Sequence, residues 1–384
     1  MKNVNHVITT FKESIFATLT NLAREHNAIN LSQGFPDFDG PDWVIQNAKD
    51  AIAQGAQGSN QYAPLQGILS LRQVLSKIYK RHYDLNYCEH TEVTITNGAT
   101  EAIFSSILAL INPGDEVIIF EPFYDSYVAS IKLAGGIPVP VTLHGPRFNY
   151  QTDKLSEAFN DKTKLIILNS PHNPTGKVFN TSELEEISKL CISHDTFCLS
   201  DEVYEFLTFN SNVHQPMATF PKMKERTITI SSTGKTFGVT GWKIGWTMAS
   251  PEITYAIRMV HQFNTFCVNH PLQIAIAKSL QELDEYLILF KKSYTKKRDL
   301  FFSGLEELGY LPIKPQGTYF IMCPIANKTK LKDVDYCMEL IKKKGVATIP
   351  PSSFYMLSND GENYLRFCFA KKDETLKTAL LKLK

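Results

Sequence analysis

The chain has 384 residues, 43% of them hydrophobic and 21% charged, which is enough for one large domain and a smaller one beside it. Its 40 Lys and Arg residues balance 39 Asp and Glu residues, which argues against binding to nucleic acid or to an anionic membrane through net charge. Any phosphate group must therefore be bound by a local site.

The sequence has no features of a secreted, membrane-spanning or metal-binding protein. It contains no run of about 18 apolar residues, and its first residues lack the apolar core of a signal peptide. The seven cysteines are never spaced CxxC, and the ten histidines include no HExxH pair. We therefore expect a cytosolic protein with reduced, mostly buried thiols and no metal site.

Short β-branched runs alternate with helical periods through the middle of the chain. We predict strands at residues 91–98, 115–122, 136–143, 163–170, 196–204, 226–233 and 245–250. Helices are predicted between several of them, for example at 99–111 and 181–195. This alternation is typical of an α/β domain with a mostly parallel sheet, whose functional loops follow the carboxyl ends of the strands.

The pattern changes after about residue 270. A long amphipathic stretch at 271–308 precedes short predicted strands at 317–323, 345–350 and 363–370, which indicates a connecting helix and a smaller α+β domain. The first 45 residues hold one short helix and a loop, so we expect them to pack on the C-terminal part or across a subunit boundary. The predicted units are a segment at 1–45, a large domain at 46–275 and a small domain at 276–384.

The stretch "SSTGKTFGVTGWKIGW" (231–246) is similar to the end of a nucleotide-binding P-loop around Lys235. A P-loop requires GxxxxGK[ST], however, and Thr229 occupies the position of its first glycine. The chain also lacks the GxGxxG fingerprint of nicotinamide dehydrogenases. Neither an ATPase nor a dehydrogenase is therefore favoured.

The turn Asn97-Gly98-Ala99-Thr100 is a better phosphate site, because it joins a predicted strand to a predicted helix. Small residues at a helix N-terminus leave backbone N–H groups and the positive end of the helix dipole facing an anion. Alone, such a turn is most often only a helix cap.

Two further motifs follow the next predicted strands. Asn173 lies in the proline-rich loop "SPHNPTG", and Asp201 ends the following strand, with Tyr204 three residues later. An acid at a strand end is often only a turn residue. Its combination with Asn173 upstream and Lys235 downstream indicates a shared site.

Together these motifs resemble the class I aminotransferases, which are pyridoxal-phosphate enzymes of fold type I. The resemblance is carried in order by "NLSQGFPDF", "NQYAPLQG", "EPFYDSY", "SPHNPTG", "SDEVYE", "SSTGKTFGVTGWKIGW", "GTYF" and "LRFCFAK". It is strongest to the kynurenine/glutamine branch, and to bacterial methionine aminotransferases through "AINLSQGFPDFDGP" and "VHQFNTFCVNHPLQ". It implies a mostly parallel seven-stranded sheet between helices plus a smaller α+β domain.

The resemblance also implies roles around the cofactor ring. Lys235 would form the Schiff base with pyridoxal 5'-phosphate and then carry the substrate's α-proton. Asp201 would keep the ring nitrogen protonated, and Tyr204 and Asn173 would hydrogen-bond the ring's 3-oxygen. Phe123 would stack on the ring face.

The cofactor phosphate would be bound by backbone and side-chain donors from three segments. The expected donors are the N–H groups of Gly98, Ala99 and Thr100, the Ser232 hydroxyl and the Lys243 ammonium. Many class I enzymes carry arginine where this chain has Lys243. Tyr62 matches a tyrosine that reaches the phosphate of the neighbouring subunit, so the resemblance implies a homodimer.

Arg366 would bind the substrate α-carboxylate through its planar guanidinium, helped by the backbone of Gly34 and by Asn173. The expected side-chain pocket is apolar and aromatic, formed by Phe16, Phe35, Tyr62, Phe123 and Phe266. No second arginine stands where a distal carboxylate would need one. We therefore expect transfer of the amino group of methionine, and of aromatic amino acids, to a 2-oxo acid.

Several alternatives remain open at this point. A kynurenine/glutamine-type aminotransferase would use the same residues, and so would a β-lyase acting on cysteine conjugates. The fold can also serve as a cofactor-sensing regulatory domain attached to a DNA-binding module, against which the near-zero net charge argues. A catalytically dead protein of this fold would normally have lost the lysine or the aspartate, but both Lys235 and Asp201 are present.

Overall fold

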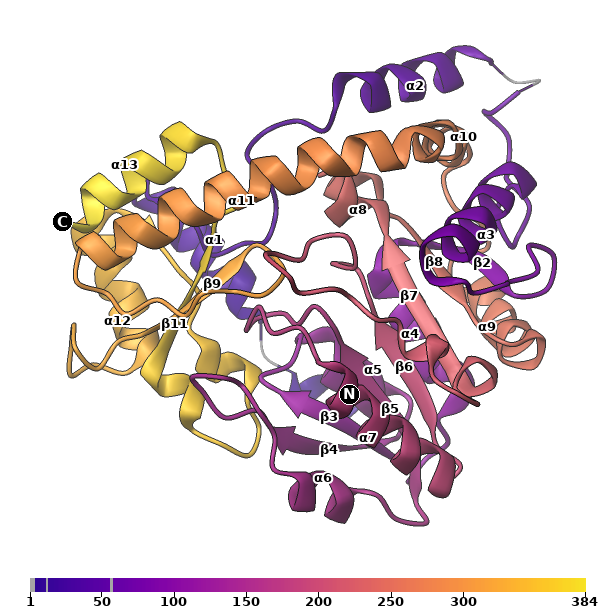
Figure 1. Cartoon of the computed structure of the whole chain (residues 1–384), viewed down its shortest axis with the longest axis horizontal. Helices are drawn as coiled ribbons and strands as arrows, with labels where there is room; N and C mark the ends of the chain where they lie inside the picture. Colours follow the sequence, from indigo (N-terminus) through magenta and orange to yellow (C-terminus); the bar gives the residue numbers. More distant parts are fainter. Residues whose placement is uncertain (1–3, 12, 56–57) are drawn as a thin grey trace.

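The computed structural model describes residues 4–11, 13–55 and 58–384. Figure 1 shows a larger body built around one sheet and a smaller body that contains the C-terminus. The sheet has seven strands in the order β2-β8-β7-β6-β5-β3-β4, and only β8 runs antiparallel to its neighbours. The predicted mostly parallel seven-stranded sheet is confirmed.

Six of the seven strands lie within the predicted segments, and β8 begins one residue before its segment, at Ile244. They are β2 Val93–Asn97, β3 Glu116–Glu121, β4 Ile137–Thr142, β5 Thr163–Asn169, β6 Phe197–Asp201, β7 Thr227–Ser232 and β8 Ile244–Met248. The helices of this body are α3 Leu69–Tyr83, α4 Gly98–Leu110, α5 Ser126–Leu133, α6 Thr152–Ala158, α7 Thr181–Ser193, α8 Thr233–Thr236 and α9 Pro251–Asn264.

Helices cover both faces of the sheet, which explains why its central strands are apolar at successive positions. Ile167 of β5 packs in one cluster with Ile103 of α4 and Ile257 of α9. Its neighbour Ile166 packs on the opposite face with Leu184 of α7. Strand pleating sends successive side chains to opposite faces, so both must be hydrophobic.

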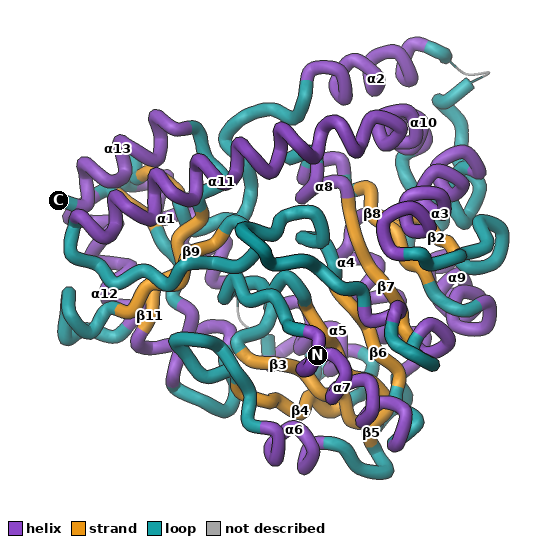
Figure 2. The backbone as a smooth tube through the Cα atoms, viewed as in Figure 1, coloured by secondary structure: helices purple, strands orange, loops and turns teal. Residues whose placement is uncertain are grey.

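The strands that carry the predicted functional residues end at one edge of the sheet. Asn169 at the end of β5 pairs in register with Asp201 at the end of β6. Ser232 ends β7 and pairs with Gly245 of β8, while Asn97 of β2 pairs with Ile244 of β8. In Figure 2 teal loops lie between the strands of this sheet and β9 and β11 of the smaller body.

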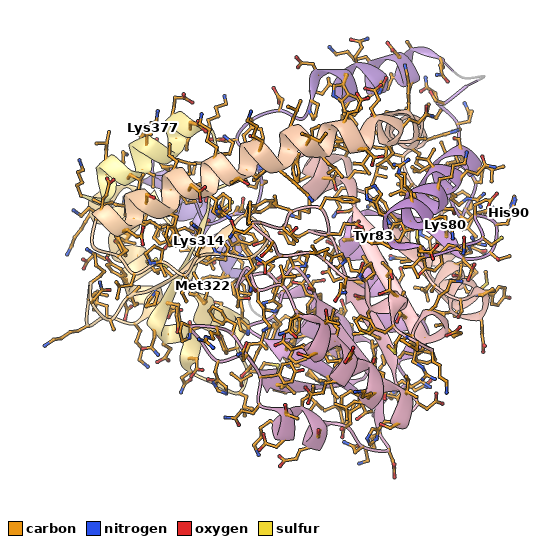
Figure 3. All side chains as sticks on the ribbon, in the orientation of Figure 1. Lys80, Tyr83, His90, Lys314, Met322 and Lys377 are labelled. Carbon is orange, nitrogen blue, oxygen red and sulfur yellow. The ribbon has the colours of Figure 1, made fainter. Side chains whose placement is uncertain are left out.

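The smaller body is built on two short sheets. In one, β9 Phe320–Pro324 pairs antiparallel with β11 Tyr364–Cys368. In the other, β1 Ile29–Asn30 pairs parallel with β10 Val346–Ala347. Helices α12 Asp333–Glu339 and α13 Asp373–Leu383 complete it. Met322 of β9, labelled in Figure 3, packs in the same cluster as sheet residues Phe120 and Leu168.

The predicted amphipathic stretch at 271–308 forms two helices. A short 3-10 turn, η5 Leu280–Glu282, separates α10 His270–Ser279 from α11 Leu283–Glu307. Figure 1 shows α11 running from beside the large body to the small one. The predicted domain boundaries at residues 45 and 275 fall inside α2 Asp42–Ala53 and α10, which pack against each other.

The N-terminal segment packs on the smaller body. Helix α1 Ile15–Glu25 buries Leu19 and Ala23 against Ile349 and Phe354. In the described part of the chain no helix is long and apolar enough to cross a membrane. No group of three or more potential metal-ligating His, Cys, Asp or Glu side chains occurs among those residues either.

Candidate active site

A cavity at the strand edge brings nine of the predicted residues together. They are Gly98, Ala99, Thr100, Asn173, Asp201, Tyr204, Ser232, Lys235 and Lys243. The remaining lining residues are Ile103, Tyr124, Asn169, Val203, Gly234, Thr240 and Ile244. These residues come from the loops after β2, β3, β5, β6 and β7, as expected for a parallel sheet.

Asp201 is a buried carboxylate held in a fixed orientation. Its side chain is 4% exposed, Tyr127 Oη donates to Oδ2 at 2.5 Å, and the Val203 N–H donates to Oδ1 at 3.4 Å. Burial raises the pKa of Asp201 to about 6, and the Tyr127 hydrogen bond opposes that rise. The group is therefore ionised at neutral pH and can pair with a cationic ring nitrogen.

Lys235 lies in the short helix α8 that follows β7. Its Nζ donates to the carbonyl oxygen of Gly34 at 3.3 Å and lies 5.7 Å from the ring centroids of Tyr204 and Tyr319. Burial lowers the pKa of this amine from 10.5 to about 8, and the nearby Asp201 carboxylate partly opposes that shift. A large fraction of Lys235 is therefore a neutral nucleophile at mildly alkaline pH.

The N-terminus of α4 forms one wall of the cavity. Gly98 has φ +73°, and a Cβ there would lie 3.2 Å from both Cε and Nζ of Lys243. A Cβ on Gly245 would lie 2.6 Å from the Gly98 carbonyl carbon. Glycine at both positions thus allows β8 and the lysine side chain to approach the helix start. Helix dipole, ammonium and Ser232 hydroxyl together suit a phosphate group.

A buried contact between Glu101 and His261 supports this wall. Glu101 Oε2 accepts from the Asn97 N–H at 2.6 Å, and Oε1 lies 2.8 Å from His261 Nδ1 on α9. His261 Nε2 lies 2.9 Å from the carbonyl oxygen of Leu65. The helix start is thus connected to the segment that follows Tyr62.

Arg366 of β11 is 1% exposed, and its guanidinium reaches the loops around the cavity. Nη1 donates to Asn173 Oδ1 at 2.9 Å and Nη2 donates to the Ser32 carbonyl oxygen at 2.6 Å. Its Nε is buried with no acceptor among the described residues. Burial lowers the pKa of Arg366 to about 10, so the group stays cationic at neutral pH. Such a cation with a donor to spare is suited to binding a carboxylate.

Aromatic rings surround Arg366. Its guanidinium carbon lies 4.0 Å from the Phe320 ring centroid, 5.5 Å from that of Phe16 and 5.7 Å from that of Phe354. Gly34 lies here too, because a Cβ on it would be 2.7 Å from the Phe320 ring. The predicted residues Gly34, Phe16 and Arg366 are therefore neighbours of one another.

Seven predicted residues are not among those that line the cavity: Arg366 with its neighbours Gly34 and Phe16, and also Phe123, Phe35, Tyr62 and Phe266. Phe123 packs in the core with Tyr127, and Tyr124 lines the cavity instead. The carbonyl oxygen of Phe35 accepts from Lys371 Nζ at 2.7 Å. Tyr62 and Phe266 are 81% and 51% exposed, with ring centroids 5.4 Å apart.

Sequence reasoning missed several residues that contact this site. Tyr124 and Tyr127 both belong to the quoted motif "EPFYDSY", but a motif does not show which of its aromatic side chains faces the cavity. Asn169 ends a predicted strand, which was the available signal for it. Its Nδ2 donates to the Asp201 carbonyl oxygen at 2.8 Å and its Oδ1 accepts from the Asn173 N–H at 2.7 Å.

The residues present fit a flat, phosphorylated aldehyde. The amine of Lys235 and the carboxylate of Asp201 line one cavity with the small-residue start of α4. Because positions 98 and 245 require glycine, that wall of the cavity consists of backbone. A phosphate can therefore approach its N–H groups closely. The pyridoxal phosphate implied by the sequence motifs is chemically compatible with this donor set.

Comparisons with known proteins agree with this geometry. A family model described as "Aminotransferase class I and II" matches residues 26–383. The methionine aminotransferase of Escherichia coli is 39% identical, with 97% of this chain and 95% of the relative covered. A kynurenine–oxoglutarate transaminase of Dictyostelium discoideum is also 39% identical, with 98% and 95% covered.

A solved structure gives the same result in three dimensions. The N-succinyldiaminopimelate aminotransferase of Mycobacterium tuberculosis superposes with a TM-score of 0.95 at 38% identity, and 99% of each chain is covered. The chain therefore belongs to the class I and II aminotransferases, pyridoxal-phosphate-dependent enzymes that transfer an amino group between an amino acid and a 2-oxo acid.

Proposed function

We propose that this aminotransferase acts on methionine and on aromatic amino acids, with 4-methylthio-2-oxobutanoate as the 2-oxo acid of methionine. The observation that carries the proposal is the apolar, aromatic surrounding of Arg366, formed by Phe16, Phe320 and Phe354. The three rings nearest to the Arg366 guanidinium carry no charge that could bind a second carboxylate. A thioether or an aromatic ring suits such walls.

Lys235 and Asp201 are assigned separate roles in the reaction. When bound, pyridoxal phosphate supplies an aldehyde and a ring that stabilises negative charge at the substrate α-carbon. We assign the covalent attachment to Lys235 Nζ, which also takes the proton from the α-carbon and returns it. Asp201, oriented by Tyr127, holds a proton on the ring nitrogen. Release of one product before the second substrate binds makes the mechanism ping-pong.

Polar side chains orient the reacting groups. Asn173 is fixed by Asn169 and accepts from Arg366. Asn173 and Tyr204 would hydrogen-bond the 3-oxygen of a bound cofactor. The backbone of Gly98, Ala99 and Thr100, with Ser232 and Lys243, would hold its phosphate. Lys235 lines the same cavity, where its amine would reach the substrate α-carbon.

Lys235→Ala should abolish covalent attachment of the cofactor and lower kcat by at least about 10³-fold, because both the nucleophile and the proton carrier are removed. The measurements are the visible absorbance of the purified protein and steady-state transamination. Lys377→Ala is the control, since Lys377 lies on α13 away from the sheet (Figure 3). A Lys235→Ala protein that kept both properties would refute the assignment.

The pH dependence of cofactor capture tests the burial of Lys235. Only the neutral amine attacks an aldehyde, so the capture rate of apoenzyme should rise with pH and level off above about 8, the lowered pKa. The same reaction with Nα-acetyl-lysine should keep rising toward about pH 10.4. Stopped-flow absorbance measures both rates. A protein profile identical to that of the model amine would contradict the lowered pKa.

A substrate panel tests the specificity. Methionine and phenylalanine should exceed aspartate and alanine in kcat/KM by more than about tenfold, because aspartate finds no second guanidinium and alanine fills too little of the pocket. Kynurenine, glutamine and a cysteine conjugate belong in the panel, with ammonia and pyruvate measured as β-lyase products. Aspartate or alanine preferred over methionine by the same margin would overturn the proposal.

We further propose a homodimer in which Tyr62 reaches the phosphate of the neighbouring subunit. Tyr62 is strongly exposed and lies outside the cavity of its own chain, with Phe266 against its ring. Phe263 and Tyr255 of α9 are also exposed aromatic residues. Rigid aromatic side chains of this kind favour a protein interface.

Sedimentation should find a dimer at micromolar concentration. Tyr62→Phe should keep the dimer but weaken the affinity for pyridoxal phosphate about tenfold, the loss of one hydrogen bond to a charged group. Tyr255→Phe removes an exposed hydroxyl from α9 and should leave that affinity unchanged. A monomer, or equal affinities of wild type and Tyr62→Phe, would contradict the shared site.

A further inference from the structure

Glu121, at the end of β3, is a fully buried carboxylate whose acceptor positions are occupied by the smaller body. Its Oε2 accepts from the N–H groups of Met356 at 2.7 Å and Leu357 at 3.0 Å. Its Oε1 accepts from the N–H of Ser358 at 2.9 Å and from Thr142 Oγ1 at 2.7 Å. Three consecutive backbone donors converging on one carboxylate form an anion-binding nest.

The charge of Glu121 is therefore balanced by backbone dipoles. None of the ion pairs formed by the described residues includes it. A buried carboxylate accepting several N–H groups is expensive to disrupt, because each donor is left without a partner. This contact joins the large body's sheet to residues 356–358 of the smaller body.

The segment held by Glu121 contains one wall of the Arg366 site. Phe354 ends the 3-10 turn η7 Pro351–Phe354, and its carbonyl oxygen accepts from the Phe123 N–H at 2.9 Å. Its ring stacks on Phe16 with centroids 5.6 Å apart and planes 29° apart. Both rings flank the guanidinium of Arg366. Two residues at and just after the end of β3 thus hold this segment: Phe123 bonds Phe354 itself, and Glu121 bonds residues 356–358.

The other end of the segment is held by the smaller body. The N–H of Ser352 donates to Asp333 Oδ2 at 2.7 Å. The residues around Phe354 are therefore tied to both bodies, and Glu121 provides three of the hydrogen bonds that tie them to the large body. Without it, Phe354 and Phe16 would still be apolar, but their positions relative to the cavity would be less defined.

We propose that Glu121 is a positioning residue for substrate binding. It holds residues 354–358 at the exit of β3, so that Phe354 and Phe16 keep the Arg366 guanidinium aligned with the substrate carboxylate. The proposal rests on the carboxylate-binding role proposed for Arg366. It concerns substrate binding rather than proton transfer, so loss of Glu121 should act on KM and leave Lys235 unaffected.

Glu121→Gln tests this with almost no change in size. Whichever way the amide turns, its NH₂ faces a backbone N–H that now donates to Glu121. In the holoenzyme, KM for the amino acid should rise about tenfold while kcat stays within about threefold. Thr142→Val is the matched control, because it removes one donor to the same carboxylate and keeps the three backbone donors. Its KM should stay within about twofold of wild type.

Two measurements do not depend on turnover. Hydrogen exchange read by mass spectrometry should show faster exchange at 356–358 in Glu121→Gln and unchanged exchange in Thr142→Val. The equilibrium Kd of 4-methylthiobutanoate, which has the carboxylate but no amino group, should rise about tenfold in Glu121→Gln. Phe354→Leu acts directly on the wall and should raise the same Kd even if Glu121→Gln proves unstable.

The outcomes separate this proposal from the proposed substrate. Unchanged exchange at 356–358 in Glu121→Gln would overturn the proposal whatever the substrate is. Faster exchange with unchanged KM and Kd would overturn it as well, because the segment would then not position the site. If wild type prefers another amino acid, the KM shift is measured with that substrate, since every amino acid carries the α-carboxylate.

Discussion

Asp201 and Lys235 carry opposite charges that are shielded from water at the edge of the sheet, and the rest of the site depends on this burial. Burial raises the pKa of Asp201 and lowers the pKa of Lys235, so both move toward neutrality. The fold offsets this cost only partly in the described chain, through Tyr127 and the Gly34 carbonyl. Buried ionisable groups with shifted pKa values are typical of functional sites that bind a charged ligand.

The parallel sheet supplies the geometry that this chemistry needs. Successive strands end at the same edge, so residues far apart in sequence, such as Asn173, Asp201 and Lys235, line one cavity. The smaller body contributes Arg366, which donates to Asn173 of the large body and to the Ser32 carbonyl just after β1 of its own body. The residues proposed for catalysis and for binding the substrate carboxylate thus come from separate bodies.

Much of this arrangement could be predicted from the sequence. The seven strands were predictable because buried parallel strands are apolar runs, and their ends located Asn97, Asp201 and Ser232. The break at η5 was not, since its residues continue the amphipathic pattern. The position of Tyr124 at the cavity wall was also unpredictable, because the direction of a side chain in an irregular loop depends on tertiary contacts. The role of Glu121 could not be predicted although it begins the motif "EPFYDSY", since three of its partners are backbone N–H groups more than 200 positions away.

The close approach of Gly245 to Gly98 has a consequence for how such enzymes diversify. The phosphate end of the cavity is made largely of main chain, which point mutations alter little. A side chain at Gly245 would collide with the Gly98 backbone, and one at Gly98 would strain a backbone with φ +73°. The end near Arg366 is walled by side chains, each replaceable on its own. Substitutions can therefore change the end near Arg366 while the phosphate end stays the same. Relatives of equal identity that bear different substrate names are the expected product of this division.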